Sequence, residues 1–86
     1  MELRKKVEEI LYKSVADVFM KDESYIVAHT DLNFRLDLNA SSTQYYPLIS
    51  DLEEQLDIDI DAHDFQYNAQ TIAQAVDYVL SVCASK

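Results

Sequence analysis

The chain of 86 residues contains no glycine, and this absence constrains its fold more than any other feature. Glycine adopts left-handed backbone conformations at little cost, so every tight turn here has to use asparagine, aspartate or an ordinary residue. Phosphate-binding loops of the usual kind are rich in glycine, and the sequence therefore excludes them.

Apolar residues at helical spacing predict three main helices. The first apolar stripe spans about five turns at steps of three and four residues, and it consists of Leu3, Val7, Ile10, Leu11, Val15, Val18 and Phe19. The second helix is expected between Ser42 and Leu56, with an apolar stripe of Tyr45, Leu48, Ile49, Leu52 and Leu56. Thr71 and Gln74 form a capping box for the last helix, whose apolar face is Ile72, Ala75, Val76, Val79 and Val82.

The start of the second helix is unusual. A hydroxyl on Ser41 or Ser42 suits the N-cap position, because it can accept a hydrogen bond from an otherwise unpaired backbone N–H. Pro47 lacks a backbone N–H and crowds the carbonyl four residues earlier. We therefore expect a tight or kinked first turn, or a regular helix that begins nearer Pro47.

The connections are predicted to be irregular. In residues 21–40 alternate positions are apolar, at Leu32, Phe34, Leu36 and Leu38. A strand pair would fit this alternation, and so would an irregular connection that lays alternate side chains on a core. One hairpin alone is marginally stable in water, so a loop with a short helical turn is preferred. Residues 57–61 alternate aspartate and isoleucine, as in a short extended connector, and a brief helical turn is expected around residues 63–66.

Together these patterns predict an all-α fold: a small bundle of three main helices plus a short fourth, with a long loop between the first two. Residues 1–86 are expected to form a single domain, because typical domains run to about 100–150 residues. The expected core is built from Val7, Ile10, Leu11, Leu48, Leu52, Ile60, Val76 and Val79.

The charge is uneven along the chain. Residues 1–20 hold four basic and four acidic side chains, whereas residues 21–86 hold three basic and twelve acidic ones and carry the whole net charge of −9. Such a surface repels nucleic acid and anionic membranes and steers toward basic patches on partner proteins. Acidity that only confers solubility is the simpler interpretation of the same charges.

The sequence also indicates a compartment. The N-terminus carries charges throughout and has no secretory pattern, and no apolar run approaches the roughly 20 residues of a membrane span. Cys83, the single cysteine, has no partner in the chain for a disulfide. A reducing cytoplasm is therefore expected.

Neither a metal site nor a catalytic centre is predicted. Asp57, Asp59 and Asp61 are spaced like the start of a calcium-binding loop, but Ala62 stands where that loop needs glycine and Asn68 where it needs glutamate. Glu53 and Glu54 are adjacent on a helix and point apart, so they do not form an acid–base pair. The chain is expected not to be an enzyme.

Ser42 has two interpretations when its residue type and position alone are considered. It can simply cap the second helix, or it can carry a phosphate ester, which the backbone N–H groups and the positive end of the helix dipole would stabilise. Capping alone does not decide between them.

Two blocks of the sequence resemble the acyl carrier proteins. That family often has the motif Asp-Leu-Gly-x-Asp-Ser-Leu at the start of its second helix, and here the corresponding residues are Asp37-Leu38-Asn39-Ala40-Ser41-Ser42-Thr43. The family's last helix commonly reads Thr-Val-x-x-Ala-Ile-Asp-Tyr-Ile, and this chain has Thr71-Ile72-Ala73-Gln74-Ala75-Val76-Asp77-Tyr78-Val79. Both blocks keep the family's relative spacing without a gap.

The resemblance implies a covalent 4′-phosphopantetheine arm on Ser42, whose thiol carries acyl or related groups as thioesters for fatty-acid, polyketide or other specialised biosynthesis. It implies a monomeric carrier that performs no catalysis. The expected partners are a phosphopantetheinyl transferase and acyl-processing enzymes with basic docking patches. The residues expected to be recognised by them are Thr43, Gln44, Asp51, Glu53 and Glu54.

The sequence departs from the family's motif at Ser41, Thr43 and Asn39, and Pro47 replaces a usual helix residue. These changes leave a second hypothesis open: a carrier-fold interaction module without the prosthetic group, docking a basic partner through its acidic second helix. In that case Ser42 would be only a cap.

Overall fold

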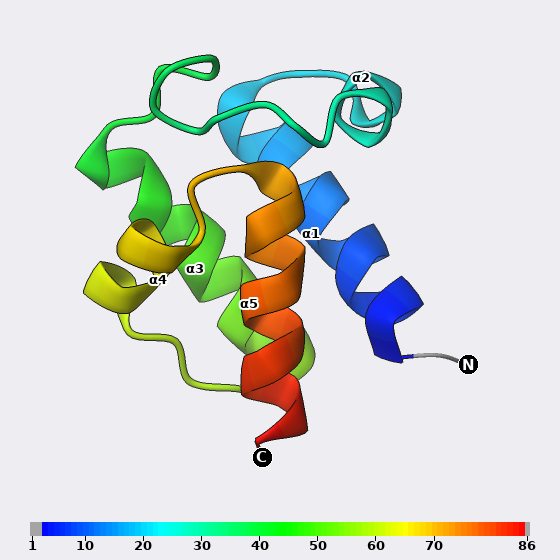
Figure 1. Cartoon of the computed structure of the whole chain (residues 1–86), viewed down its shortest axis with the longest axis vertical. Helices are drawn as coiled ribbons and strands as arrows, with labels where there is room; N and C mark the ends of the chain where they lie inside the picture. The colour runs from blue at the N-terminus through cyan, green and yellow to red at the C-terminus, as the bar shows by residue number, and fades with distance from the viewer. Residues whose placement is uncertain (1–2, 86) are drawn as a thin grey trace.

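A computed structural model describes residues 3–85, with Ser42 described by its backbone alone. Five helices follow one another along the chain (Figure 1): α1 (Leu3–Phe19), α2 (Glu23–Ala28), α3 (Ser42–Leu56), α4 (Ala62–Asn68) and α5 (Ile72–Ala84). The predicted all-α class is confirmed, and so are the three long helices. None of the described helices is long and apolar enough to cross a membrane.

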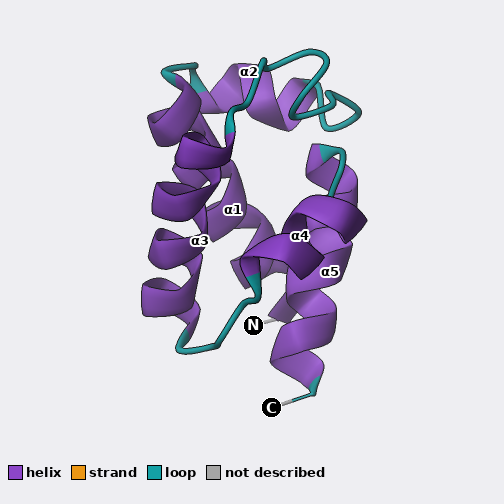
Figure 2. Ribbon diagram, turned by 90° about the vertical axis from the view of Figure 1, so that its left-hand side faces the viewer, coloured by secondary structure: helices purple, strands orange, loops and turns teal. Residues whose placement is uncertain are grey.

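The other two long helices, α3 and α5, pack against α1. This helix contacts α2, α3 and α5, while the short α4 lies against α3 and α5 (Figures 1 and 2). Every predicted core residue is buried except Ile10, which is half-buried and packs against the core. The apolar stripes on α1, α3 and α5 thus meet in one core, as their periodicity requires.

The long connection before α3 contributes a residue to the centre of this core. Phe34 is fully buried, and its ring centroid lies 6.0 Å from those of Phe19 and Tyr45 and 6.4 Å from that of Phe65. These separations are within the range of favourable aromatic pairs. The connection is therefore part of the folded core, although its backbone is irregular.

Two expectations for residues 21–40 need correction. The short helical turn is a six-residue helix, α2, which buries Ile26 and leaves Tyr25 and Val27 exposed. The alternation of apolar residues does not place all of them on the core: Phe34 is buried, but Leu36 is 84% exposed. The chain turns between these two positions, because the Asn33 side-chain oxygen accepts hydrogen bonds from the Arg35 and Leu36 N–H groups.

Among residues 3–85, three take the left-handed conformation that glycine would otherwise occupy. They are Met20, Asn39 and Asp57, with φ of 58°, 58° and 54°. Met20 and Asp57 each directly follow a long helix, and the N–H one residue later bonds back to the carbonyl five residues earlier, Lys21 to Ala16 and Ile58 to Glu53. This is the Schellman arrangement that ends many helices, usually with glycine. The chain therefore turns at ordinary residues, as expected.

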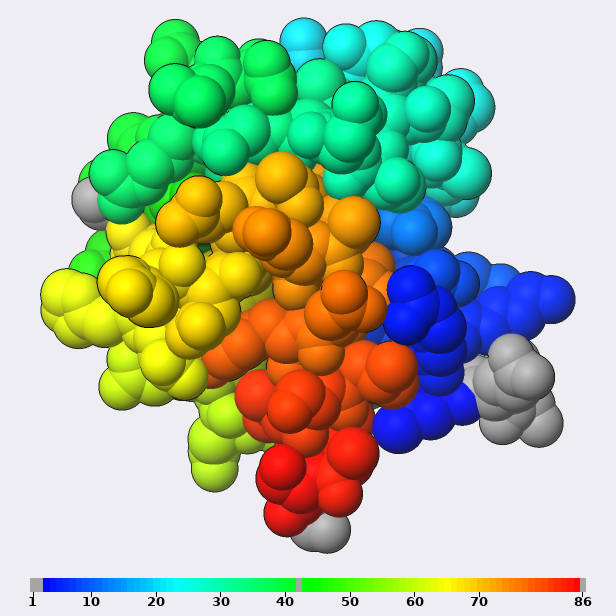
Figure 3. Space-filling model, viewed as in Figure 1, coloured from blue at the N-terminus to red at the C-terminus, as the bar shows by residue number. Residues whose placement is uncertain are grey.

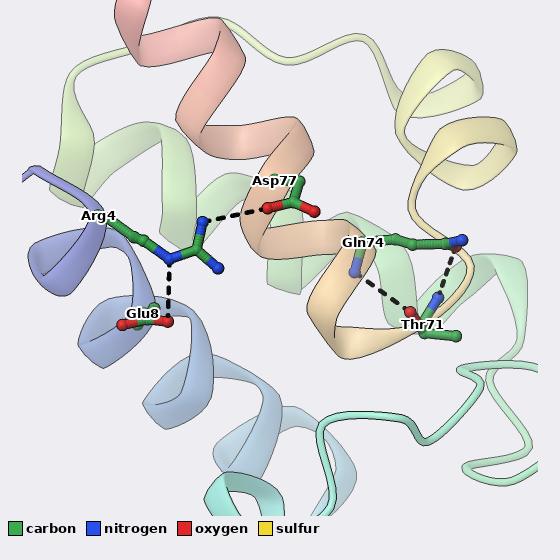
Figure 4. A network of polar contacts seen from close by, with 5 residues as sticks. All are labelled: Arg4, Glu8, Thr71, Gln74 and Asp77. Carbon is green, nitrogen blue, oxygen red and sulfur yellow. Dashed lines mark hydrogen bonds and ion pairs between the residues drawn. The ribbon is translucent and has the colours of Figure 1, made fainter.

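Polar contacts cap the start of α5 and join its middle to α1 and α4. The predicted capping box is present: Gln74 N–H donates to Thr71 Oγ1, and Thr71 N–H donates to Gln74 Oε1 (Figure 4). Arg4 of α1 bridges Glu8 and Asp77, which ties α1 to α5. Tyr78 donates to Asp64 of α4 at 3.0 Å, and burial and this bond raise the pKa of Tyr78 to about 12.

Candidate functional site

The first turn of α3 begins at Ser42, within the predicted motif. Ser41 is its N-cap, with extended backbone (φ −102°, ψ 165°), and it forms a capping box with Gln44. The Gln44 side chain accepts the Ser41 N–H at 2.9 Å. The regular helix therefore starts at Ser42 and continues through Pro47, and it does not begin nearer Pro47. The side chain of Ser42 lies outside what the structure describes.

The backbone at this position suits an attached phosphate group. The N–H groups of a helix's first turn have no intrahelical partner, and the helix dipole places partial positive charge there. The first turn of α3 contains no acidic residue, so no carboxylate within it would repel an anion. These features match the chemistry that a phosphate ester on Ser42 requires.

Asn39 supplies the turn that leads into this helix. It stands at the position of the glycine in the family's motif and adopts the left-handed conformation that glycine favours. Asparagine is among the residues that tolerate this conformation best. Nearby, the Ala40 N–H donates to the main-chain carbonyl of Phe34, which connects the turn to the residue whose ring is buried in the core. The departure from the motif at this position thus preserves the local backbone.

The five residues expected to be recognised by partners lie in different environments. Thr43 and Glu54 are exposed, and Thr43 Oγ1 lies 2.8 Å from Ser41 Oγ. Gln44 is half-buried and is used by the capping box. The set thus does not form one free acidic surface.

Two carboxylates of α3 accept hydrogen bonds from other segments of the chain. Asp51 accepts hydrogen bonds from the buried Ser14 hydroxyl of α1 and from Gln55. Glu53 accepts the Ile60 N–H at 2.8 Å, which fixes the connector after α3. Both were predicted as residues that partners recognise. Their hydrogen bonds within the chain were not predicted, because the groups that donate to them are 37 and 7 residues away in the sequence.

A cleft of about 500 Å³ opens beside the start of α3. One wall is the connection at Asn33, Arg35 and Leu36, and the other is α4 at His63, Gln66 and Tyr67. Tyr45, one turn beyond Ser42 on α3, and Gln70 also line it. Sequence analysis missed this cleft, because it joins segments that carry no common motif. The view in Figure 3 shows the connection lying directly against α4 and the start of α5.

Backbone hydrogen bonds fix the connection against the start of α5. Phe34 N–H donates to the Gln70 carbonyl at 2.9 Å, and Ala73 N–H donates to the Thr30 carbonyl at 2.9 Å. Asn33 and Thr71 form an isolated antiparallel bridge. The cleft therefore has a wall held by main-chain contacts as well as by the buried ring of Phe34.

Comparisons with known proteins agree with the resemblance. A family model described as "Phosphopantetheine attachment site" matches residues 2–79. An acyl carrier protein of Lactobacillus johnsonii is 35% identical over 78 residues, which cover 86% of this chain and 94% of the relative. No solved structure matches. The cofactor of such domains is 4′-phosphopantetheine, held covalently. The chain therefore belongs to the acyl carrier protein family.

Proposed function

We propose that this chain carries acyl or related intermediates as thioesters on a 4′-phosphopantetheine arm attached to Ser42. The arm supplies the thiol that holds the cargo. The protein itself performs no catalysis; it shields the cargo and presents it to enzymes of fatty-acid, polyketide or another specialised biosynthesis. We propose that it works as a monomer in the cytoplasm, without binding nucleic acid or membrane.

The backbone position of Ser42 carries this proposal. Ser42 is the first residue of α3, preceded by an extended N-cap, so an ester there would lie at the N-terminus of the helix, beside the positive end of its dipole. Ser41 and Thr43 also bear hydroxyls, but Ser41 occupies the cap. In the family's motif the modified serine aligns with Ser42.

Intact mass spectrometry tests the attachment. After co-expression with a broad-specificity transferase, the wild-type chain should gain one phosphopantetheine, and Ser42→Ala should gain none. Ser41→Asn is the matched control, because it removes the neighbouring hydroxyl and keeps a good N-cap; it should still gain the arm. An unmodified wild-type chain, or an addition that survives Ser42→Ala, would contradict the proposal. An unmodified chain purified from its native cell would favour the interaction module instead.

We further propose that the transferase and the acyl-processing enzymes dock through basic patches on the exposed part of the predicted recognition set. Within that set the exposed residues are Thr43 and Glu54. Gln44, Asp51 and Glu53 each make an intramolecular hydrogen bond, so they support the surface more than they contact a partner.

A pair of α3 variants separates contact with a partner from support of the fold. Glu54→Lys should lower the transferase's kcat/KM for this chain severalfold. In salt concentrated enough to screen the net charge, it should leave the thermal midpoint of the chain nearly unchanged, since surface substitutions usually change stability by about 0.5 kcal/mol or less. Glu53→Gln should lower the thermal midpoint, because a neutral amide accepts the Ile60 N–H less strongly than a carboxylate does. Equal kinetic losses in both variants, with no change in stability, would contradict this division.

A further inference from the structure

The cleft beside α3 contains an unusual cation. Arg35 is the only lysine or arginine in residues 22–85, a stretch with twelve acidic residues. The ion pairs within residues 3–85 both belong to Arg4, so Arg35 is paired with none of these acids. Its Nη2 instead donates to the neutral Gln66 side chain across the cleft at 2.9 Å.

Arg35 is exposed, and this bond directs its guanidinium toward Gln66 while leaving most of its donors for another group. A guanidinium has five N–H donors in a planar fork that matches a carboxylate with two parallel hydrogen bonds. The contact to Gln66 uses one nitrogen and does not neutralise the charge. A cation that is not paired with a protein acid, at the edge of a cleft, favours an anionic ligand.

The nearby carboxylates are engaged by other groups. Asp37 accepts the Asn33 N–H at 2.7 Å. Asp61 accepts the Asp64 N–H as the N-cap of α4, and Asp64 accepts the Tyr78 hydroxyl. Asp61 and Asp64 line a neighbouring, more open hollow that shares His63 and Tyr67 with the cleft. These carboxylates keep their negative charges, but their hydrogen bonds go to other groups, and Arg35 is the lysine or arginine side chain among the residues that line the cleft.

The remaining lining suits a short cargo with a polar end. The exposed side chains of Leu36 and Tyr67 flank the cleft, and Tyr45 and Gln70 complete it. A plain hydrocarbon end placed here would take water from the guanidinium without replacing its hydrogen bonds, which costs free energy. A carboxylate would replace them.

We propose that the cargo is an acyl group that ends in a second carboxylate, and that Arg35 binds this carboxylate in the cleft while Gln66 orients the guanidinium. The inference rests on the proposed function, because the cargo would reach the cleft on the arm at Ser42. Tyr45 lies on α3 three residues after Ser42 and also lines the cleft, so the attachment point and the binding site share one helix.

Nuclear magnetic resonance on loaded protein tests the proposal. The wild-type chain is loaded with a non-hydrolysable amide analogue of the cargo, either glutaryl, which ends in a carboxylate, or pentanoyl, which ends in a methyl group. The glutaryl form should shift the Arg35 Nε–H and Gln66 side-chain amide signals, and the pentanoyl form should leave them near their unloaded positions. Arg35→Gln should abolish the glutaryl shifts at Gln66, whereas Arg4→Gln, which removes a cation from α1, should preserve them.

The outcomes separate the two proposals. Equal shifts for glutaryl and pentanoyl, or glutaryl shifts at Gln66 that persist in Arg35→Gln, would overturn the inference about the cargo. If the transferase does not modify Ser42, the unmodified chain is titrated with the free monoamide of glutaric acid, which ends in a carboxylate, or with pentanamide, which ends in a methyl group. Shifts at Arg35 and Gln66 that are specific to the glutaric monoamide would support the cleft while the arm proposal fails, and their absence would overturn the cleft.

Discussion

Met20 shows how single residues replace glycine in this chain. It follows α1 in the left-handed conformation and is 90% exposed, so its side chain contributes little packing there. A left-handed backbone costs a residue with a Cβ atom about 1–2 kcal/mol, whereas glycine adopts it freely. Asp57 has the same role after α3, with a side chain that tolerates the conformation better.

Replacing Met20 with glycine should therefore stabilise the domain. We expect Met20→Gly to raise the free energy of unfolding by about 0.5–1 kcal/mol, after subtraction of the greater freedom that glycine has in the unfolded chain. Urea unfolding followed by circular dichroism measures this. Glu54→Gly, within α3, is the control and should lose about 1 kcal/mol. A loss in both variants would show that the conformation of Met20 is not strained.

The same scale explains which site residues could be predicted. Thr71 was identifiable as a cap, and Ser41 as one of two candidates beside Ser42, because capping depends on neighbours three residues away. The roles of Asp51 and Glu53 were not identifiable, because an acid on a helix looks the same in sequence whether it contacts solvent or bonds to another segment. Their actual partners, Ser14 and the Ile60 N–H, follow only from tertiary packing.

At the scale of one element, Pro47 lowers the stability of α3. It lies inside the helix, five residues beyond its first residue, so the Thr43 carbonyl lacks the N–H that residue 47 would normally donate. The helix nevertheless persists from Ser42 to Leu56, since its apolar stripe is buried at Tyr45, Leu48 and Leu52. Packing thus outweighs the local cost of the proline.

Pro47→Ala should restore that hydrogen bond and relieve the crowding. The expected gain is about 2 kcal/mol, because proline costs about 3 kcal/mol in a helix interior and its rigidity in the unfolded chain offsets part of this. Guanidinium unfolding measures the change, and Ser50→Ala, an exposed substitution later in α3, should change stability by about 0.5 kcal/mol or less. An unchanged or lower stability in Pro47→Ala would show that the helix has already accommodated the ring.

The hydrogen bond from Tyr78 of α5 to Asp64 of α4 makes the free energy of unfolding depend on pH in the alkaline range. A tyrosine in an unfolded chain has a pKa of about 10, whereas that of Tyr78 is raised to about 12. Between these values the unfolded chain releases its proton first, so the contribution of Tyr78 is complete below about pH 10 and is lost as the pH rises toward about 12. Tyr78→Phe should flatten this decline in urea midpoint. Tyr67→Phe, which removes an exposed hydroxyl of α4, should not.

Periodicity predicted the long helices because each buries a full stripe. The end of α3 followed from its last apolar residue, Leu56, and the start of α5 followed from the Thr71 cap. α2 was expected only as a helical turn, since six residues bury one apolar side chain, Ile26, and give no repeat to detect. The position of Leu36 was wrong because alternation describes a straight extended chain, whereas the Asn33 side chain bends this one.

At the scale of the whole molecule, the net charge of −9 opposes compaction. Salt screens this repulsion, with a Debye length of about 10 Å at 0.1 M, so the melting temperature should rise between about 10 mM and 500 mM sodium chloride. Glu54→Gln should raise the melting temperature at low salt and reduce its dependence on salt. A melting temperature that does not change with salt would indicate that the acids are already well separated or neutralised by bound cations.

The cleft belongs to this scale, because no segment contains it. Arg35 and Gln66 are 31 residues apart and meet only after α4 has packed against α3 and the connection has turned back over both. Residues 21–86 hold three basic side chains against twelve acidic ones, but such a count does not say where Arg35 lies in the folded molecule.

The burial of Phe34 has a consequence for motion. A surface loop usually opens at little free-energy cost, independently of the rest of the molecule. This connection cannot do so, because lifting it would expose a fully buried ring and break its main-chain bonds to residues 70–73. We therefore expect its amide protons near Phe34 to exchange with solvent as slowly as those at the start of α5. The entrance beside Arg35 would then be set when the chain folds, and a cargo would find it already formed.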